Sequence, residues 1–449
     1  MLKRKIWDTL IEWKEDSNKK ALCIIGARQI GKSTIVREFG KTNYEQVFEV
    51  NFIEDRNAHT IFEGDLSGNK ILEGLTAYYH KEIIPGKTLV IFDEVQVCGA
   101  ARTAVKFLVD DGRIDLIETG SQLGIRYKEF DSLPVGYEQI ENMFPLDFEE
   151  FVWAMDIQLS TLATLKHCFE TKTAPTQTLH EVMMRLFYAY LVVGGMPEVV
   201  QSYVVNHDIA KVTKIQRRIL DLYRMDIARY AQPTERVKIK EILDAIPSQL
   251  DQKTNRFRLS YLHKDARMNR YENSFLWLRE AGVAYCCFNI KAPVYPLILN
   301  EKRNLFKLYL NDTGLLCSMV EDVQFALLQG DVSINQGSLL ENVFAQSFVS
   351  KGLSLNYFDN KKWELDFVVE QDREIDLIEI KSGKDYKKHF SLNHALEVKE
   401  WKIRDAIVFS KYPLEVENGI TYLPFYMIMF YAKKPKAKPL IWNIDLQGF

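Results

Sequence analysis

The stretch Gly26-Ala27-Arg28-Gln29-Ile30-Gly31-Lys32-Ser33, followed by Thr34, decides the fold of this chain. It matches the pattern G-x-x-x-x-G-K-[ST], in which a glycine-rich loop wraps around a phosphate group. The apolar run before it predicts a buried parallel strand, and residues 33–39 predict a helix that ends at Gly40. Backbone N–H groups at the start of such a helix bind anions. We expect Lys32 to reach the β- and γ-phosphates of a nucleotide and Ser33 to ligate Mg²⁺; the alternative is a glycine-rich turn without a ligand.

The composition is that of a globular chain with several domains. The 449 residues are enough for about three domains, and a hydrophobic content of 47% with 27% charged residues argues against disorder. The net charge of −3 indicates that the chain as a whole has no excess of positive charge, although local basic patches remain possible. Six scattered cysteines without a C-x-x-C spacing predict reduced thiols and no zinc site. Because no long apolar segment follows the N-terminus, and residues 423–432 are too short to span a bilayer, we expect a cytoplasmic protein without membrane contact.

A second landmark is the apolar run 87–94, which predicts a strand that ends in two carboxylates. We expect this strand beside the strand of the loop, with Asp93 completing the Mg²⁺ shell and Glu94 polarising an attacking water. The alternative is a strand that ends in solvated acids. Residues 114–122 predict another strand, and Ser121 at its end is a candidate to sense the γ-phosphate or hold the water. A plain strand-to-loop turn explains this segment equally well.

These segments together carry a family resemblance. Residues 26–33, 93–94 and 119–121 resemble the Walker A, Walker B and sensor-1 elements of AAA+-type ATPases. Residues 144–151 and 193–198 resemble the P-L-x-F-x-E-F segment and G-G-x-P turn of a prokaryotic branch, in which the ATPase module is fused to a C-terminal region of unassigned role. The resemblance implies ATP and Mg²⁺ as ligands, an open, mostly parallel α/β sheet, and Pro197 at the nucleotide base. It leaves the oligomeric state open and favours none of three candidate arginine fingers, Arg102, Arg113 and Arg126.

The middle of the chain is predicted to be helical. Apolar residues at three- and four-residue intervals in 159–169, 179–193 and 209–228 predict a lid of helices over the nucleotide. Residues 236–300 then resemble a winged helix: helices begin at 237, 261 and 271, Pro247 ends the first of them, and 283–289 and 296–300 are the wing strands. Arg267, Arg270 and Arg279 are candidates to meet a DNA backbone. The alternative is a module for packing or protein contact.

The C-terminal region holds a third group of charged residues. Residues 337–350 predict a helix that carries Glu341, and 363–370 and 375–381 predict two strands joined by a tight turn. Period two places Glu379 and Lys381 on one face, where Asp366 of the neighbouring strand joins them. Carboxylates in such an arrangement hold Mg²⁺, and a nearby lysine orients the bound water. A basic run at 386–389 follows as a candidate contact for a phosphate backbone.

This arrangement resembles the PD-(D/E)XK nuclease core, with Glu341, Asp366, Glu379 and Lys381 at the matching positions and Leu365 in place of the proline. The resemblance implies a restriction-endonuclease-like α/β domain. The alternatives are a hairpin with solvated charges, or an inherited fold that binds nucleic acid or a partner without cutting.

We therefore predict an AAA+-like ATPase core over 1–147, a helical lid over 148–235, a winged-helix-like domain over 236–300 and a nuclease-like domain over 301–449. The expected function is ATP hydrolysis that controls the C-terminal domain, with DNA or RNA as its substrate. The alternative is a slowly hydrolysing, nucleotide-gated switch or scaffold for a protein partner, without nuclease activity.

Overall fold

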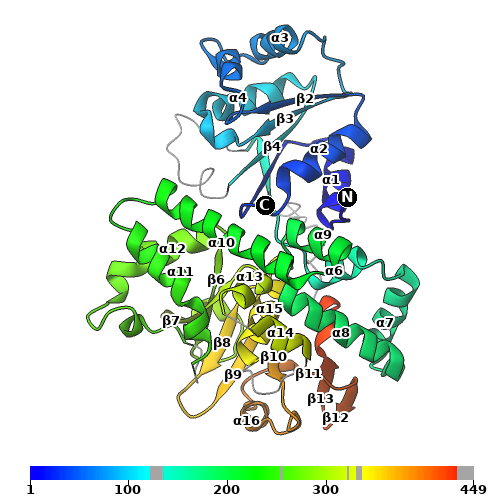
Figure 1. The fold of residues 1–449 in the computed structure, drawn as a ribbon, viewed down its shortest axis with the longest axis vertical. Coiled ribbons are helices and arrows are strands. Elements are labelled where there is room, and N and C mark those ends of the chain that lie inside the picture. The colour runs from blue at the N-terminus through cyan, green and yellow to red at the C-terminus, as the bar shows by residue number, and fades with distance from the viewer. Residues whose placement is uncertain (122–133, 135, 253–255, 321–322, 330–335, 432–449) are drawn as a thin grey trace, which may run out of the picture.

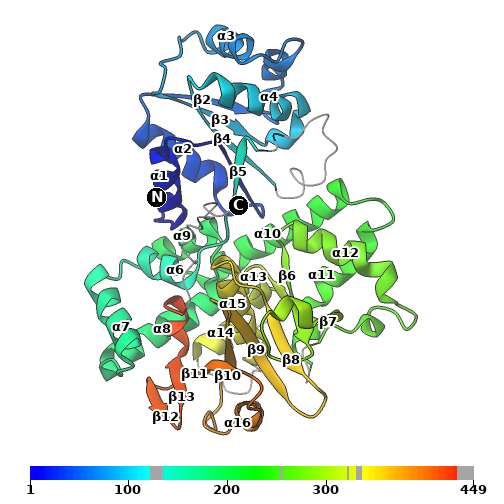
Figure 2. The same cartoon turned by 180° about the vertical axis from the view of Figure 1, so that it is seen from behind.

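The computed structural model describes residues 1–121, 134, 136–252, 256–320, 323–329 and 336–431. Two sheets organise the chain: a smaller one at the top of Figure 1 and a larger one below it. Helices lie between the two sheets (Figures 1 and 2). The N-terminal helix and one end of the smaller sheet lie on the side of these helices. No helix in the described part of the chain is long and apolar enough to cross a bilayer.

The smaller sheet is entirely parallel, as predicted for the first part of the chain, and its described strands run in the order β2-β3-β4-β1-β5. Its elements are α1 (Ile6–Glu15), β1 (Ala21–Gly26), α2 (Lys32–Asn43), β2 (Gln46–Asn51), η1 (Arg56–Phe62), α3 (Gly68–Tyr79), β3 (Thr88–Asp93), η2 (Val95–Val97), α4 (Gly99–Asp111), β4 (Asp115–Ser121) and β5 (Glu138–Asn142).

Two local predictions for this sheet are wrong. The strand that ends in Asp93 does not pair with the strand of the loop, because β4 lies between β3 and β1. Gly40 does not end the helix either: α2 continues to Asn43, and Gly40 is a buried contact position. A Cβ at Gly40 would lie 3.0 Å from side-chain atoms of Leu89 and Val47, so glycine lets the helix pack closely on β2 and β3.

The next part of the chain is helical, as predicted. It comprises α6 (Phe148–Ala154), α7 (Leu159–Thr171), α8 (Gln177–Val193), α9 (Pro197–Asn206), α10 (Ile209–Tyr230), α11 (Arg236–Leu250), η3 (Leu259–Tyr261) and α12 (Met268–Glu280). Pro247 does not end its helix, because α11 runs on to Leu250. The helix predicted at 261–266 is absent from the described residues, where only the short turn η3 forms.

The larger sheet is mixed, and its described strands run in the order β12-β13-β11-β10-β9-β8-β6-β7. Its elements are β6 (Ala284–Ile290), η4 (Leu297–Asn300), β7 (Glu301–Leu310), α13 (Thr313–Ser318), α14 (Val323–Gln329), α15 (Gly337–Ser350), β8 (Asn356–Asp359), β9 (Glu364–Gln371), β10 (Glu374–Lys381), α16 (Phe390–Glu397), β11 (Ile403–Ser410), β12 (Glu415–Glu417), β13 (Ile420–Pro424) and η5 (Phe425–Met429).

The predicted wing is wrong, because its strands belong to this larger sheet. Residues 284–290 form a strand, but 297–300 form a short 3-10 turn and the partner strand is β7. β6 pairs with β7 on one side and with β8 on the other. The boundary predicted at residue 300 therefore separates two paired strands of one sheet.

One buried apolar cluster connects the two sheets. It contains Leu22 and Ile24 of β1, Phe148 and Phe151 of α6, and continues through α8 to Phe409 of β11. Separate clusters cover the other face of the smaller sheet and the far side of the larger one. Because apolar contact is continuous from β1 to β11, the nucleotide loop and the C-terminal sheet share a packed interior.

Candidate functional site

The glycine-rich loop joins β1 to α2 as the sequence predicts. Gly31 is the N-cap of α2 with φ 89°, a left-handed conformation that glycine adopts without strain. Lys32 Nζ donates hydrogen bonds to the carbonyl oxygens of Gly26 at 3.0 Å and Ala27 at 2.8 Å. Burial lowers the pKa of Lys32 to about 8, although Glu94 and Asp93 act in the opposite direction. The ammonium thus stands at the mouth of the loop.

Asp93 is the centre of the polar contacts beside this loop. Its buried carboxylate accepts hydrogen bonds from Ser33 Oγ at 2.7 Å, Asn51 Nδ2 at 3.0 Å and the Thr119 hydroxyl. Arg37 lies 3.4 Å away. A hydroxyl and a carboxylate that meet in this way supply oxygen ligands of the kind that hard divalent cations prefer, so Ser33 and Asp93 fit a bound divalent metal ion.

Thr119 and Asn51 were not among the predicted site residues. Both stand at or near the carboxyl ends of strands that neighbour β3, since β4 and β2 flank it. The positions of these two residues in the sequence could have indicated their role, because polar residues near the ends of parallel strands meet at one edge of a sheet. The side chain of Ser121, predicted for this role, lies outside the described residues.

Glu94 directly follows β3 and adopts a left-handed conformation, with φ 55°. Such a backbone is costly for a residue other than glycine and is enriched at functional sites. Its carboxylate accepts a hydrogen bond from Gln96 Nε2 at 2.5 Å. Glu94 also acts electrostatically on Lys32, since it raises the pKa that burial lowers.

The candidate arginine fingers are now distinguished in part. Arg102 is 1% exposed and pairs with Glu118 and Glu138, each at 2.6 Å, so it holds the sheet interior together and cannot serve as a finger. Arg113 pairs with Asp111 at 2.7 Å near the surface. Arg126 lies outside the described residues.

Pro197, which the resemblance predicts at the nucleotide base, lies beside the loop. It begins α9 and lines a cavity of about 240 Å³ together with Gly31, Thr34 and Ile35. A Cβ at Gly31 would stand 3.6 Å from Pro197 Cγ, so the α9 N-terminus and the loop are neighbours. An apolar cavity beside a phosphate loop is suited to a nucleotide base.

Helix α10 also contacts the loop. Arg28 pairs with Asp226 at 2.9 Å, and the Tyr223 hydroxyl lies 3.5 Å from the carbonyl oxygen of Arg28. The same hydroxyl accepts a hydrogen bond from Asn311 at the end of β7. Burial raises the pKa of Asp226, while Arg28 acts in the opposite direction. Through these contacts α10 connects the loop to the larger sheet.

The structure brings the four predicted C-terminal residues together. Glu341 projects from α15, Asp366 from β9, and Glu379 and Lys381 from β10. Burial and the neighbouring Glu341 and Glu379 raise the pKa of Asp366 to about 8. Lys381 Nζ lies 2.8 Å from Glu379 Oε2, whereas Glu379 Oε1 is buried and accepts no hydrogen bond from a described residue.

Sequence reasoning missed three residues in or beside this group. Lys307 of β7 is fully buried and lies 3.1 Å from Glu341 and 2.7 Å from Glu364, and the Tyr309 hydroxyl donates to Glu341 at 2.6 Å. Burial lowers the pKa of Lys307, but its carboxylate neighbours outweigh burial and the net shift is upward. The presence of a lysine within the apolar run 306–310 could have indicated this buried position from the sequence.

The charge balance of this acid cluster has a surplus of negative groups. We define the acid cluster as the carboxylates Glu341, Glu364, Asp366 and Glu379 with the ammoniums Lys307 and Lys381. If all four carboxylates are ionised, they exceed the two ammoniums by two negative charges, which two protons or one divalent cation would offset. Glu379 Oε1 is a buried oxygen of the cluster that accepts no hydrogen bond from a described residue.

Other candidate groups serve the fold. In the basic run after β10, Lys387 pairs with Glu415 at 2.9 Å and Glu417 at 2.7 Å. Among the described residues, the only three potential metal ligands within 4.8 Å of one another are Cys23, Glu118 and Glu138. Since Arg102 pairs with both glutamates and burial raises the pKa of the Cys23 thiol, this group forms an internal ion-pair network.

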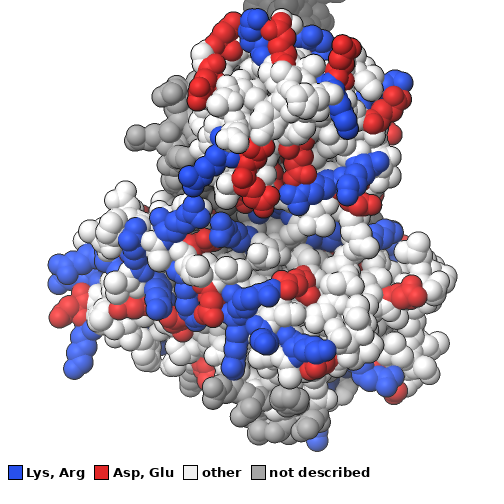
Figure 3. All heavy atoms as spheres, turned by 45° about the horizontal axis from the view of Figure 1, so that its top comes forward, with Lys and Arg blue, Asp and Glu red and all other residues white. Residues whose placement is uncertain are grey.

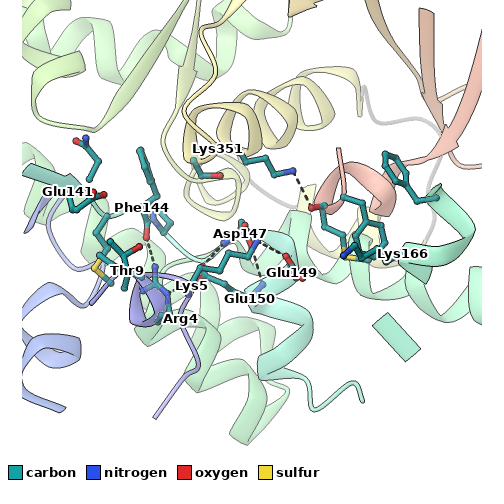
Figure 4. Close-up of a pocket in the computed structure, with 18 of the residues that line it drawn as sticks. Arg4, Lys5, Thr9, Glu141, Phe144, Asp147, Glu149, Glu150, Lys166 and Lys351 are labelled. Carbon is teal, nitrogen blue, oxygen red and sulfur yellow. Dashed lines mark hydrogen bonds and ion pairs between the residues drawn. The ribbon is translucent and has the colours of Figure 1, made fainter. Parts of the chain in front are cut away.

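The junction between the two sheets encloses a cavity of about 450 Å³, shown in Figure 4. Arg4 donates to the carbonyl oxygen of Ile30 in the loop at 3.0 Å and to that of Phe144 at 2.6 Å, and it pairs with Glu150. Across the cavity, Lys351 donates to the carbonyl oxygens of Ile428, Met429 and Tyr431. Charged side chains of the two halves thus meet at this junction.

A line of buried hydrogen bonds crosses the same junction. The Tyr190 hydroxyl of α8 donates to the carbonyl oxygen of Leu146 at 2.6 Å and accepts from Gln346 Nε2 of α15 at 2.9 Å. Leu146 N also donates to the carbonyl oxygen of Gly195 at 2.7 Å. Because Gln346 and Glu341 share α15, this line runs from the segment after β5 to the helix of the acid cluster.

Three family models match separate parts of the chain. An AAA domain matches residues 18–152, and two domains of unknown function, DUF8612 and DUF4143, match 184–325 and 336–428. No curated protein matches the chain.

Solved structures show distant likeness. The Walker-type ATPase of Pyrococcus abyssi is 13% identical, with a TM-score of 0.41, and the match covers 71% of this chain and 96% of that one. The Orc1 protein of Aeropyrum pernix, solved in complex with DNA, is 11% identical, with a TM-score of 0.28 and coverages of 72% and 92%. The PCH-2 protein of C. elegans is 11% identical, with a TM-score of 0.27 and coverages of 44% and 59%.

The AAA-domain match covers the loop, Asp93 and Glu94, the residues that the geometry gathers at one edge of the smaller sheet. The N-terminal part of this chain, residues 18–152, is an AAA domain of the P-loop ATPase type.

Proposed function

We propose that the chain is a Mg²⁺-dependent ATPase whose nucleotide state controls its C-terminal α/β domain. The contact between Ser33 and Asp93, 2.7 Å apart beside the loop of Lys32, carries the proposal. Lys32 and the N–H groups at the start of α2 would bind the phosphates of ATP. Mg²⁺ held by Ser33 and Asp93 would offset negative charge on the phosphate oxygens.

Glu94 is the proposed general base. It stands one residue beyond Asp93 and acts electrostatically on Lys32, so a water placed at the γ-phosphate would lie within its reach. Thr119 donates to Asp93 and would keep that carboxylate in position. Pro197 and Ile35 would contact the base.

Substitutions at these two positions separate binding from hydrolysis. Lys32→Ala is expected to abolish ATP binding, whereas Glu94→Gln should bind ATP normally and hydrolyse it about 100-fold more slowly, because the base is lost. Calorimetry measures binding, and phosphate release measures turnover. Glu63→Gln, an exposed glutamate of the same domain, is the matched control. Turnover by Glu94→Gln at the parent rate would show that another group is the base.

Control of the C-terminal domain is supported by the two connections between the loop and the larger sheet. One runs through Arg28, Asp226 and Tyr223 of α10, and the other through Tyr190 and Gln346. Closure of the loop around ATP would displace Arg28, and α10 would follow.

The second candidate function is metal-dependent cleavage of nucleic acid at the acid cluster. The unpartnered Glu379 Oε1 and the raised pKa of Asp366, caused by burial and by two neighbouring carboxylates, favour it. A divalent cation bound there would lower the pKa of a water, and Lys381 would stabilise charge on the phosphate.

One incubation distinguishes this candidate from the nucleotide-gated switch without nuclease activity. Single- and double-stranded DNA and RNA are mixed with Mg²⁺ or Mn²⁺, with and without ATP. Cutting that is lost in Lys381→Ala but kept in Lys384→Ala, an exposed lysine three residues away, supports cleavage. Absence of cutting, together with nucleotide-dependent binding of a protein partner, supports the switch.

A further inference from the structure

Positive charge is concentrated in one part of the chain. Residues 209–282 contain sixteen Lys and Arg against nine Asp and Glu, a net charge of +7, although the whole chain has a net charge of −3. The rest of the chain is therefore strongly acidic by comparison. In Figure 3 this part of the lower half shows Lys and Arg side chains more densely than Asp and Glu.

Many of these cations have no carboxylate partner. Eight exposed Lys and Arg side chains of this part form no ion pair with any described residue. Two of them are Lys211 and Lys264. The other six are Lys214, Arg217 and Arg229 of α10, Lys240 of α11, and Arg267 and Arg270 at the start of α12. We call these six residues the basic face. Elsewhere surface cations are often paired, as Lys387 is with Glu415 and Glu417.

The arrangement of α10 places its cations along one side of the helix. Lys214 and Arg229 are fifteen residues apart and lie within about 60° of each other around the helix axis, with Arg218 between them. They span about 22 Å along the axis. Helices α11 and α12 pack together, and α11 contacts α10, so the remaining cations lie on helices that adjoin α10.

Exposed aromatic rings accompany the cations. Tyr230 is 39% exposed and Tyr261 is 55% exposed, and the guanidinium of Arg229 stands 5.2 Å from the ring of Tyr230. Exposed tyrosines with arginines are suited to stacking on bases, while guanidinium groups match the geometry of phosphates. An extended row of unpaired cations fits a polyanion with regularly spaced charges.

From this surface we infer that the basic face binds nucleic acid through its phosphate backbone, with Tyr230 and Tyr261 available to unpaired bases. Among the described residues, no cation of the basic face forms a hydrogen bond or ion pair with Lys32 or with a residue of the acid cluster, although α10 itself contacts the loop through Asp226. Binding is therefore retained in Lys32→Ala and in Lys381→Ala, and loss of ATPase or nuclease activity leaves the inference standing. Because these two variants are expected to bind nucleic acid, a failed test of the basic face can be distinguished from a failed test of the proposed function.

The test is fluorescence anisotropy on the full chain with labelled single-stranded DNA, single-stranded RNA and duplex DNA of about 30 nucleotides. Salt is varied between about 50 and 200 mM, because each phosphate contact contributes about −0.7 to the slope of log K against log salt for a single strand. Replacing the six cations of the basic face by Gln is expected to reduce this slope by about 4. The three α10 substitutions alone are expected to reduce it by about 2.

The matched control replaces three exposed, unpaired cations of the ATPase domain, Lys41, Arg56 and Lys81, by Gln and is expected to leave the slope unchanged. Circular dichroism and thermal unfolding show whether each variant is folded. Absence of binding by the parent, or a slope that is equal in the six-fold variant and the control, overturns the inference. Equal binding of poly-glutamate with the same dependence on the six residues also overturns it and assigns the face to an acidic polypeptide.

Discussion

At the scale of single residues, the ammonium of Lys32 controls how the site responds to pH. Its pKa is about 8 because it is buried, and phosphate binding would raise it. Below pH 8 the lysine is already charged, so its protonation adds no pH dependence to ATP binding. Above pH 8 binding must take up a proton, and affinity should fall about tenfold per pH unit. Calorimetry between about pH 7 and 9.5 measures this fall, and a constant affinity would contradict the lowered pKa.

The predicted position of a residue agrees with the structure where the spacing of a sequence motif determines that position. Lys32 and Ser33 lie where the loop between a strand and a helix places them, and Asp93 at the end of its strand contacts Ser33. Thr119 belongs to the stretch that resembles sensor 1, but its contact with Asp93 was not predicted, because strand order determines which strands are neighbours and the sequence does not display it.

The acid cluster likewise contains some residues that were predicted and others that were missed. Asp366, Glu379 and Lys381 meet as the period-two pattern predicted, and Glu341 joins them as the resemblance implied. Lys307 was missed, since no strand was predicted at 301–310. Its position became visible only when β7 was placed in the larger sheet.

At the scale of elements, the turn between α8 and α9 is a tight contact of three chain segments. Gly195 N donates to Asp312 at 2.6 Å, and a Cβ at Gly195 would lie 1.9 Å from the carbonyl oxygen of Leu146. Gly195→Ala is expected to lower the free energy of unfolding by about 3 kcal/mol or more, because backbone must move. Denaturant unfolding measures the effect. Gly383→Ala, whose Cβ would meet its nearest atom at 4.0 Å, should unfold like the parent.

Most strands and helices were predicted within a few residues, since apolar periodicity records which face is buried. The errors have local causes. Gly40 and Pro247 were interpreted as helix ends, yet Gly40 permits close packing, and α11 continues for one further turn after Pro247 although the proline removes one backbone hydrogen bond. Short segments such as 261–266 lacked the length for a secure pattern.

At the scale of the whole molecule, Tyr190 connects the two sheets. In Tyr190→Phe, ATP should bind normally, but the change that ATP causes in hydrogen exchange of α15 should be reduced, because the bond to Gln346 is lost. Exchange mass spectrometry on the Glu94→Gln background, with and without ATP, measures the change. Tyr188→Phe, a half-buried tyrosine on the same helix, is the matched control. An equal response in both variants would exclude this route.

The domain organisation was the least predictable part, because pairing between strands distant in sequence leaves no local pattern. β6 was assigned to a small domain and β7 to the next, although the two strands pair along most of their length.

That pairing has a consequence for any shortened form of the chain. A product that starts at residue 301 would keep β7 but lose β6, the strand that joins β7 to β8. The exposed edge of β8 would then present its N–H and C=O groups to other molecules, and such unpaired strand edges promote self-association. Truncation at a boundary that looks natural in the sequence would thus yield aggregates instead of an isolated C-terminal unit.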